Sequence, residues 1–127
     1  MEQERREKER RQPKATTFVA LRSEFIKLGK LMDISSSGLC FEYIAKGDVA
    51  SGPDTLEMDM FISGNGYYLP NVLCRLAYDV KKKKEMTFMI GLEYRRCGLQ
   101  FTRLSEKQMD QLEYFLTHHT AGGELEQ

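Results

Sequence analysis

From Thr16 onward, apolar and polar residues alternate along most of the chain. A period of two is typical of antiparallel strands that bury one face. Successive side chains of a strand point to opposite sides of the sheet, so one set in each run is expected to face inward. The inward-facing residues predicted in this way are Leu39, Phe41 and Tyr43; Leu56, Met58, Met60 and Ile62; Val72, Cys74, Leu76, Tyr78 and Val80; and Phe88, Ile90, Leu92 and Tyr94.

Turn-forming residues separate these runs. Ser63-Gly64-Asn65-Gly66 is a strong hairpin signal, and residues 46–54 contain two glycines and a proline, as loops do. Residues 81–85 predict a charged, solvated hairpin tip, to which no binding role is given. Many short strands with turns between them indicate a closed barrel or a sandwich, and the short chain favours a barrel.

The period changes near the C-terminus, where the sequence predicts a helix. Its apolar face is Met109, Leu112, Phe115 and Leu116, and its polar face is Glu106, Lys107, Asp110 and Glu113. Ser105 and Gln108 predict a capping box, and Leu104 with Met109 a hydrophobic staple. We expect the helix to cover an open end of the barrel. The two histidines near its end, at positions 118 and 119, lack other ligands at metal-binding spacing, so no metal site is predicted.

The two ends of the chain differ from the middle. Residues 1–14 hold six basic and four acidic side chains and nothing apolar after Met1. They predict a flexible, arginine-rich arm, transiently helical through Glu and Arg pairs, until Pro13 ends any helix. Residues 121–127 are polar and predict a disordered tail. The expected organisation is therefore the arm over 1–14, the barrel with its helix over 15–120, and the tail.

The composition limits the cellular compartment and the kinds of binding partner that are expected for this protein. With 127 residues, 41% of them hydrophobic, the chain is expected to form one domain with a modest core. Nineteen basic residues balance nineteen acidic ones, so no overall field attracts nucleic acid or an anionic membrane. Three cysteines without a CxxC pair, the lack of a membrane-length apolar run and a charged N-terminus predict a soluble, cytoplasmic protein that is not exported.

A polar stretch, Asp33-Ile34-Ser35-Ser36-Ser37-Gly38, stands between two predicted strands. Its residues are ordinary turn formers, so a plain hairpin connection would also explain it. In an extended segment, however, Asp33 and Ser35 point the same way and present a carboxylate and a hydroxyl to one ligand. A carboxylate accepts the paired N–H donors of a guanine edge, and Gly38 allows a ligand to approach the backbone closely.

Arginines upstream supply the second candidate feature. Arg6 and Arg10 lie one turn apart if their segment is helical, in an arm that is free to fold over the barrel. The planar guanidinium group matches phosphate oxygens, or guanine O6 and N7, in a bidentate way, and its face stacks on a purine. The two features together weaken the interpretation of the stretch as a plain turn, because their groups suit a guanine edge and phosphates.

At these residues the sequence resembles the PilZ domain family, whose signature is RxxxR followed, after a strand or two, by [D/N]xSxxG. The matching residues are Arg6 and Arg10 for the first motif, and Asp33, Ser35 and Gly38 for the second. Gly98-Leu99-Gln100-Phe101 resembles the family's closing strand, so the resemblance covers nearly the whole chain. It implies a mainly β fold, a six-stranded antiparallel PilZ-type barrel with a C-terminal α-helix, in agreement with the strands and helix predicted above.

The resemblance also implies a receptor for the bacterial second messenger cyclic di-GMP. In the family the RxxxR arginines bind the phosphates and guanines of this ligand, so Arg6 and Arg10 would do so here. Asp33 and Ser35 would hydrogen-bond a guanine, and Gly38 would keep the barrel surface open beneath it. Binding is expected to order the arm over the barrel, and this ordering would be the signal.

Other basic residues of the arm affect which pair forms the RxxxR motif and how many nucleotides the chain is expected to bind. Arg10 and Lys14 form a second RxxxR-like pair, but lysine does not supply the bidentate fork, so Arg6 and Arg10 are preferred. Arg11 is an auxiliary candidate for the site. Arg5 directly precedes the motif and would help to hold a second, stacked nucleotide, so the number of nucleotides per chain, one or two, is left open.

No catalytic constellation accompanies these motifs, because the sequence shows no nucleophile with a base and no phosphate loop that opens a helix. The predicted protein is a receptor, not an enzyme, with no cofactor, acting through an effector protein of motility, adhesion or exopolysaccharide machinery. The alternative is a PilZ-like barrel that acts as a protein-interaction module without binding nucleotide. A nucleic-acid-binding barrel ranks last, because the adjacent Tyr67 and Tyr68 face opposite ways in a strand.

Overall fold

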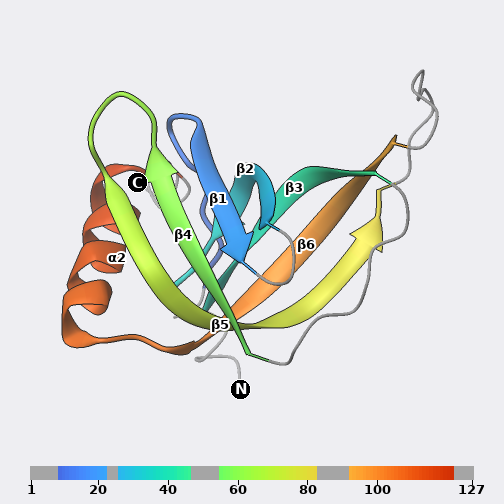
Figure 1. The fold of residues 1–127 in the computed structure, drawn as a ribbon. Coiled ribbons are helices and arrows are strands. Elements are labelled where there is room, and N and C mark those ends of the chain that lie inside the picture. The colour runs from blue at the N-terminus through green and yellow to red at the C-terminus, as the bar shows by residue number, and fades with distance from the viewer. Residues whose placement is uncertain (1–8, 23–25, 47–54, 83–91, 122–127) are drawn as a thin grey trace.

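A computed structural model of the protein describes residues 9–22, 26–46, 55–82 and 92–121. These residues form six strands and a helix (Figure 1). In chain order they are β1 (Thr17–Arg22), β2 (Ile26–Ile34), β3 (Gly38–Lys46), β4 (Leu56–Ile62), β5 (Tyr68–Lys81), β6 (Leu92–Arg103) and α2 (Glu106–His118).

The strands close into an antiparallel barrel in the order β1-β2-β3-β6-β5-β4. The predicted six-stranded barrel with a C-terminal helix is therefore confirmed. One strand boundary differs from the sequence prediction, because the alternating run that ends at Tyr94 and the closing strand at residues 98–101 belong to the single long strand β6. The predicted inward residues Phe88 and Ile90 lie outside the described residues.

Apolar side chains fill the barrel interior, as the period of two predicts for β3 and β4. Completely or almost completely buried are Val19, Leu21, Leu31, Ile34, Leu39, Phe41, Met58, Met60, Leu69, Val72 and Cys74. Leu112 and Phe115 of α2 join the same core. Burial of one such large side chain stabilises the fold by about 1.5–3 kcal/mol, so this interior is the main source of the barrel's stability.

Strand β5 departs from the predicted alternation in its second half. Val72 and Cys74 are buried as predicted, but Tyr78 and Val80 are 41% and 48% exposed. A β-bulge between Leu76 and Tyr78 shifts the register against β6. One extra residue sends every following side chain to the opposite face of the sheet. The prediction that Tyr78 and Val80 face the core is therefore wrong.

The same bulge turns Asp79 inward, where it forms a polar cluster at one end of the barrel. Its carboxylate accepts hydrogen bonds from Tyr43 Oη at 2.6 Å, Arg95 Nε at 2.8 Å and Lys27 Nζ at 3.2 Å. Burial alone would raise the pKa of Asp79, but these three hydrogen bonds outweigh it and lower the pKa. Because β6 turns Arg95 toward this cluster, Tyr94 points outward and is 39% exposed, contrary to the prediction.

Helix α2 begins with the predicted capping box. The backbone N–H of Gln108 donates to Ser105 Oγ at 3.1 Å, and the backbone N–H of Ser105 donates to Gln108 Oε1 at 2.9 Å. Two backbone donors at the helix start are thus satisfied. The local sequence alone therefore fixes where the helix begins.

The helix lies beside the start of β5 (Figure 1). Leu112 and Phe115 are buried against the barrel, and the Tyr67 hydroxyl donates to the carbonyl oxygen of Gln111 at 2.8 Å. Met109, predicted on the same apolar face, is 49% exposed. The buried stripe of α2 is therefore narrower than the sequence pattern indicates, because Met109 lies at its edge, next to an open groove.

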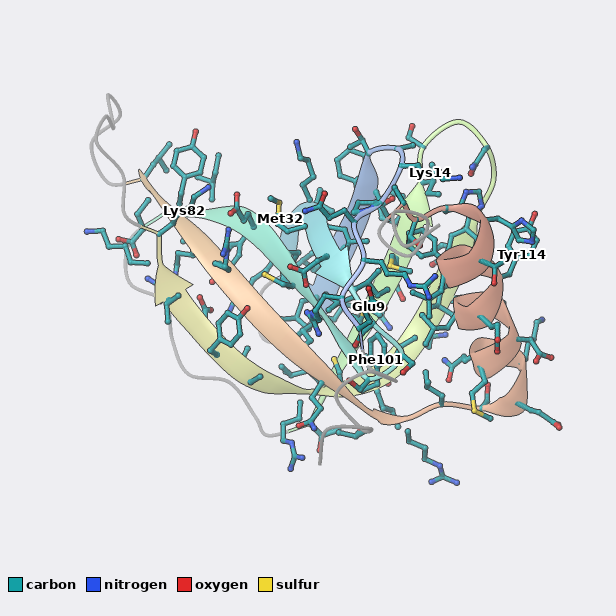
Figure 2. All side chains as sticks on the ribbon, turned by 180° about the vertical axis from the view of Figure 1, so that it is seen from behind. Glu9, Lys14, Met32, Lys82, Phe101 and Tyr114 are labelled. Carbon is teal, nitrogen blue, oxygen red and sulfur yellow. The ribbon has the colours of Figure 1, made fainter. Side chains whose placement is uncertain are left out.

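Residues 9–14, the last part of the predicted arm, join β2 to the end of α2. Arg11 and Ile34 exchange two backbone hydrogen bonds of 2.8 and 2.9 Å, and the N–H of Lys14 donates to His119 O at 2.8 Å. Figure 2 shows Lys14 beside the C-terminal end of the helix. The earlier residues of the arm lie outside the described part of the chain, so its flexibility and its boundary stay predictions.

The turn between β4 and β5 is the predicted one. Gly64 and Gly66 have φ values of 97° and 83°, a region that glycine adopts without steric cost. The other two predicted connections fall mostly outside the described residues, at positions 47–54 and 83–91.

The three cysteines at positions 40, 74 and 97 are buried and free of disulfide bonds. Within the described ranges, no three His, Cys, Asp or Glu side chains gather in a way that could hold a metal ion. No helix among the described residues is long and apolar enough to cross a membrane.

Candidate functional site

Four residues form one row across the outer face of the barrel. Asp33 of β2 is the Cα partner of Cys40 in β3, and Cys40 is the partner of Gly98 in β6. Gly98 is in turn the partner of Tyr78 in β5. Partner residues of neighbouring strands lie side by side on one face of a sheet. A carboxylate therefore stands at one end of the row and a phenol at the other.

Both ends of this row are set by β-bulges. In β2 the register shifts between Leu31 and Asp33, so Leu31 and Ile34 are both buried while Asp33 faces out. In β5 the bulge after Leu76 turns Tyr78 outward in the same way. Bulges commonly re-aim a side chain beside a functional site, and here two of them bring Asp33 and Tyr78 to one surface.

Arg10 connects the N-terminal segment to the Asp33 end of the row. Its Nε and Nη2 atoms lie 2.8 and 2.6 Å from Asp33 Oδ1, and its Nη1 donates to Ser35 Oγ at 3.4 Å. Both contacts with Asp33 end on Oδ1, and Oδ2 has no hydrogen-bond or ion-pair partner among the described residues. The side chains are 46% and 35% exposed, so the ion pair contributes about 1 kcal/mol or less. A ligand can therefore exchange with it at low cost.

Ser35 is fully buried and organises the loop that follows β2. Its Oγ accepts a hydrogen bond from the backbone N–H of Ser37 at 3.1 Å, and its own N–H donates to Gly38 O at 2.8 Å. The same Oγ accepts from Arg10. The hydroxyl of Ser35 thus stabilises the loop and holds the Arg10 side chain in position.

Two glycines leave the middle of this surface without side chains. A Cβ atom at Gly38 would lie 2.2 Å from the carbonyl oxygen of Leu99, and one at Gly98 would lie 2.3 Å from Cε2 of Tyr78. Both distances are far below van der Waals contact, so neither position accepts a side chain unless its neighbours move. The sheet therefore carries no side chain at these two positions, and the Tyr78 ring packs directly on the backbone of Gly98.

The Tyr78 ring covers Gly98. Interaction with the nearby Cys40 thiol and partial burial raise the pKa of Tyr78 to about 12, so the phenol is neutral at physiological pH. Burial raises the pKa of Cys40 as well, which keeps the thiol protonated and weakly nucleophilic. The row therefore offers an aromatic surface and hydrogen-bonding groups rather than a reactive nucleophile.

These side chains border a shallow hollow of about 410 Å³. Its lining includes Arg10, Asp33, Ser37, Gly38, Tyr78, Gly98 and Gln100. A guanidinium group, a carboxylate, an aromatic ring and an amide meet here beside two glycines. This combination suits a planar, polar ligand that carries negative charge, because arginine and aromatic faces stack on planar rings and arginine pairs with anions.

The structure brings some of the predicted site residues together and not others. Those at the hollow or directly behind it are Arg10, Asp33, Ser35 and Gly38. Arg11 points to α2 instead, where its Nη1 donates to the carbonyl oxygen of Leu116 at 3.3 Å. Arg5 and Arg6 lie outside the described residues, so the register of the RxxxR motif stays open.

The sequence interpretation did not identify several residues of the hollow, among them Tyr78, Gly98 and Gln100. The alternating pattern places Tyr78 in the core, and it identifies Gly98 and Gln100 only as parts of a strand. A glycine inside an apolar strand often marks a close approach, so Gly98 carried a signal. Nothing in the local sequence marks the bulge that exposes Tyr78, because the residues around it continue the apolar alternation.

The fold and the site define a class of small proteins: a closed six-stranded antiparallel barrel with a C-terminal helix, in which an arginine of the N-terminal segment meets a DxSxxG loop on the outer face. The chain belongs to the PilZ domain family, whose model matches residues 4–118. This match confirms the resemblance inferred from the motifs.

Among solved structures, the chain is similar to one described as the crystal structure of the Borreliella burgdorferi PlzA protein in complex with c-di-GMP. The TM-score is 0.49 and the sequence identity is 15%. The similarity covers 79% of this chain and 45% of that chain, so this chain spans less than half the length of that protein. No curated protein matches the sequence.

Proposed function

We propose that this protein is a receptor for cyclic di-GMP and that the ligand binds at the hollow on the outer face of the barrel. The observation that supports this most directly is the contact of Arg10 with both Asp33 and Ser35. It joins the arginine segment and the DxSxxG segment, which are far apart in the sequence, in a single site. Membership of the PilZ family supplies the identity of the ligand.

Each side chain has a role that follows from its chemistry. The Arg10 fork binds a phosphate or the O6 and N7 atoms of a guanine. Asp33 accepts the N1 and N2 hydrogens of a guanine through Oδ2, while Oδ1 keeps Arg10 in place. Ser35 is too deeply buried to be a main ligand contact, so we assign it the positioning of Arg10. The exposed part of the Tyr78 ring is a platform for a base.

The N-terminal arm completes the site in this proposal. Arg5 and Arg6 precede Arg10 in the chain and supply further guanidinium groups for phosphates and for a second nucleotide. Arg11 remains an auxiliary candidate that would have to leave Leu116 in order to reach the ligand. Ordering of the arm over the barrel then changes the surface that a partner protein meets, which is how the signal would pass on without any chemistry on the ligand.

Calorimetric titration with cyclic di-GMP, with GTP as the control nucleotide, tests this function. The wild type should bind cyclic di-GMP saturably, and Arg10→Ala and Asp33→Ala should each lose most of the affinity. Arg103→Ala is the matched control, because Arg103 is an exposed arginine of β6 outside the hollow and should leave binding unchanged. A wild type that shows neither heat nor a shift in melting temperature would refute the receptor function and leave an interaction module.

A further inference from the structure

A second basic residue lies next to the hollow on its β5 side, whereas Arg10 lies on its β2 side. Arg75 of β5 is the Cα partner of Gln100 in β6, which is itself the partner of Gly38 in β3. This second row lies next to the row that runs from Asp33 to Tyr78, because Gly38 and Gln100 are each two residues from a member of that row. Gln100 lines the hollow, and Arg75 Nη2 donates to Gln100 Oε1 at 3.2 Å. The guanidinium of Arg75 is therefore held at the rim.

Arg75 differs from the other arginines of this face in its partners. Arg10 is paired with Asp33 at 2.6 Å, and Arg96 is paired with Glu42 at 2.9 Å. Among the described residues, the Arg75 side chain hydrogen-bonds to the neutral amide of Gln100 and takes part in no ion pair. An arginine without a carboxylate partner keeps its full attraction for an anion, and most of its five N–H donors stay available.

We propose that Arg75, oriented by Gln100, is a second phosphate-binding subsite of the hollow. This inference rests on the proposed function, since it concerns the same ligand. A cyclic dinucleotide carries two phosphodiester groups, each with one negative charge, and Arg10 lies on the β2 side of the hollow. Arg75 and Tyr78 lie on the same strand at the opposite side. They can therefore bind the second phosphodiester and an adjacent base together.

An arginine at position 75 suits a phosphodiester ligand better than a lysine would. Its planar fork donates two parallel hydrogen bonds to a pair of phosphate oxygens, which a lysine does not. The hydrogen bond to Gln100 fixes the plane of the guanidinium before the ligand arrives, and this lowers the entropy cost of binding. Neither residue belongs to the two sequence motifs, so the subsite is a property of the folded face.

Titration of Arg75→Gln with cyclic di-GMP at low and high potassium chloride concentration tests the subsite. The variant should bind about tenfold more weakly than the wild type at low salt, as expected for the loss of one charge-assisted contact. Its affinity should also depend less on salt concentration. The variant lacks one charged contact with the ligand, and salt screens contacts of this kind. Arg75→Lys should keep the salt dependence and lose part of the affinity. Arg103→Gln, the matched exposed control, should behave as the wild type.

The possible failures are distinguishable. If the wild type binds cyclic di-GMP and Arg75→Gln binds it equally well, the subsite is refuted while the receptor function stands. If Arg75→Gln loses affinity without any change in salt dependence, Arg75 does not contact a phosphate. Because Arg75 is exposed, the melting temperature of the unliganded variant should equal that of the wild type. A lower melting temperature would mean that Arg75 is a structural residue. A wild type that does not bind would overturn both proposals.

Discussion

The Tyr78 ring lies over Gly98, its Cα partner on the neighbouring strand, so closely that a Cβ atom on Gly98 would stand 2.3 Å from the ring. The aromatic side chain of β5 thus occupies the space that a side chain of β6 would otherwise take. This pairing gives the hollow its aromatic wall. Substitutions at the two positions should therefore be coupled.

Gly98→Ala should displace the Tyr78 ring and weaken ligand binding. The added methyl group overpacks the surface, which costs about 1–3 kcal/mol of unfolding free energy. Removal of the ring in Gly98→Ala/Tyr78→Ala should restore much of that stability without restoring affinity. Urea unfolding and titration with cyclic di-GMP measure the two effects in a double-mutant cycle. Strictly additive stability changes would contradict the packing described for this pair.

Gly38→Ala should destabilise the unliganded protein more than Gly98→Ala does. The new Cβ atom would lie 2.2 Å from the backbone oxygen of Leu99, which cannot rotate away as a side chain can. The expected result is a lower melting temperature before any ligand is added. If the variant melted as the wild type does and lost only ligand affinity, then Gly38 would serve ligand approach alone, as the sequence motif suggests.

Ser35→Ala should weaken binding through Arg10. The substitution removes the Oγ atom that accepts from Arg10 and from the N–H of Ser37, at a cost of roughly 1 kcal/mol, or about fivefold in affinity. Titration should show this loss while the response to Arg10→Ala becomes smaller in the Ser35→Ala background. Ser63→Ala, in the exposed turn after β4, is the matched control. Independent effects of the two substitutions would argue against a positioning role for Ser35.

Asp79→Asn should destabilise the barrel at neutral pH by about 3 kcal/mol, because Arg95 and Lys27 would lose their buried counter-charge. The pKa of Asp79 is lowered in the folded state. Its stabilising contribution is therefore complete above the unfolded pKa of about 3.9 and is lost as the pH falls through the folded pKa. The gap in unfolding free energy between wild type and variant should thus narrow below about pH 4. Urea unfolding at pH 7 and pH 3 measures it, and a constant gap would refute the linkage.

The sequence by itself determined the class of fold. Alternation in β3 and β4 identified the inward faces, because a side-chain period of two leaves a half-buried strand no other arrangement. The capping box at Ser105 and the glycines of the β4–β5 turn fixed the ends of their elements through local hydrogen bonds and backbone freedom. The DxSxxG stretch also singled out residues that line the hollow, since its residue types are chemically distinctive.

Only the tertiary structure determined which face of the barrel wall the residues beside the two β-bulges occupy. The two bulges depend on how β2 pairs with β3 and β5 with β6, and nothing within either strand encodes that pairing. As a result Tyr78 lies outside and Asp79 lies inside. Arg75, which precedes the bulge of β5, lies beside the hollow because it pairs with Gln100 of β6. The contact between Arg10 and Asp33 likewise spans 23 residues of sequence, so it exists only once the barrel has closed. The local pattern of apolar and polar residues determines where the strands lie. The register between neighbouring strands determines which side chains come together at the site.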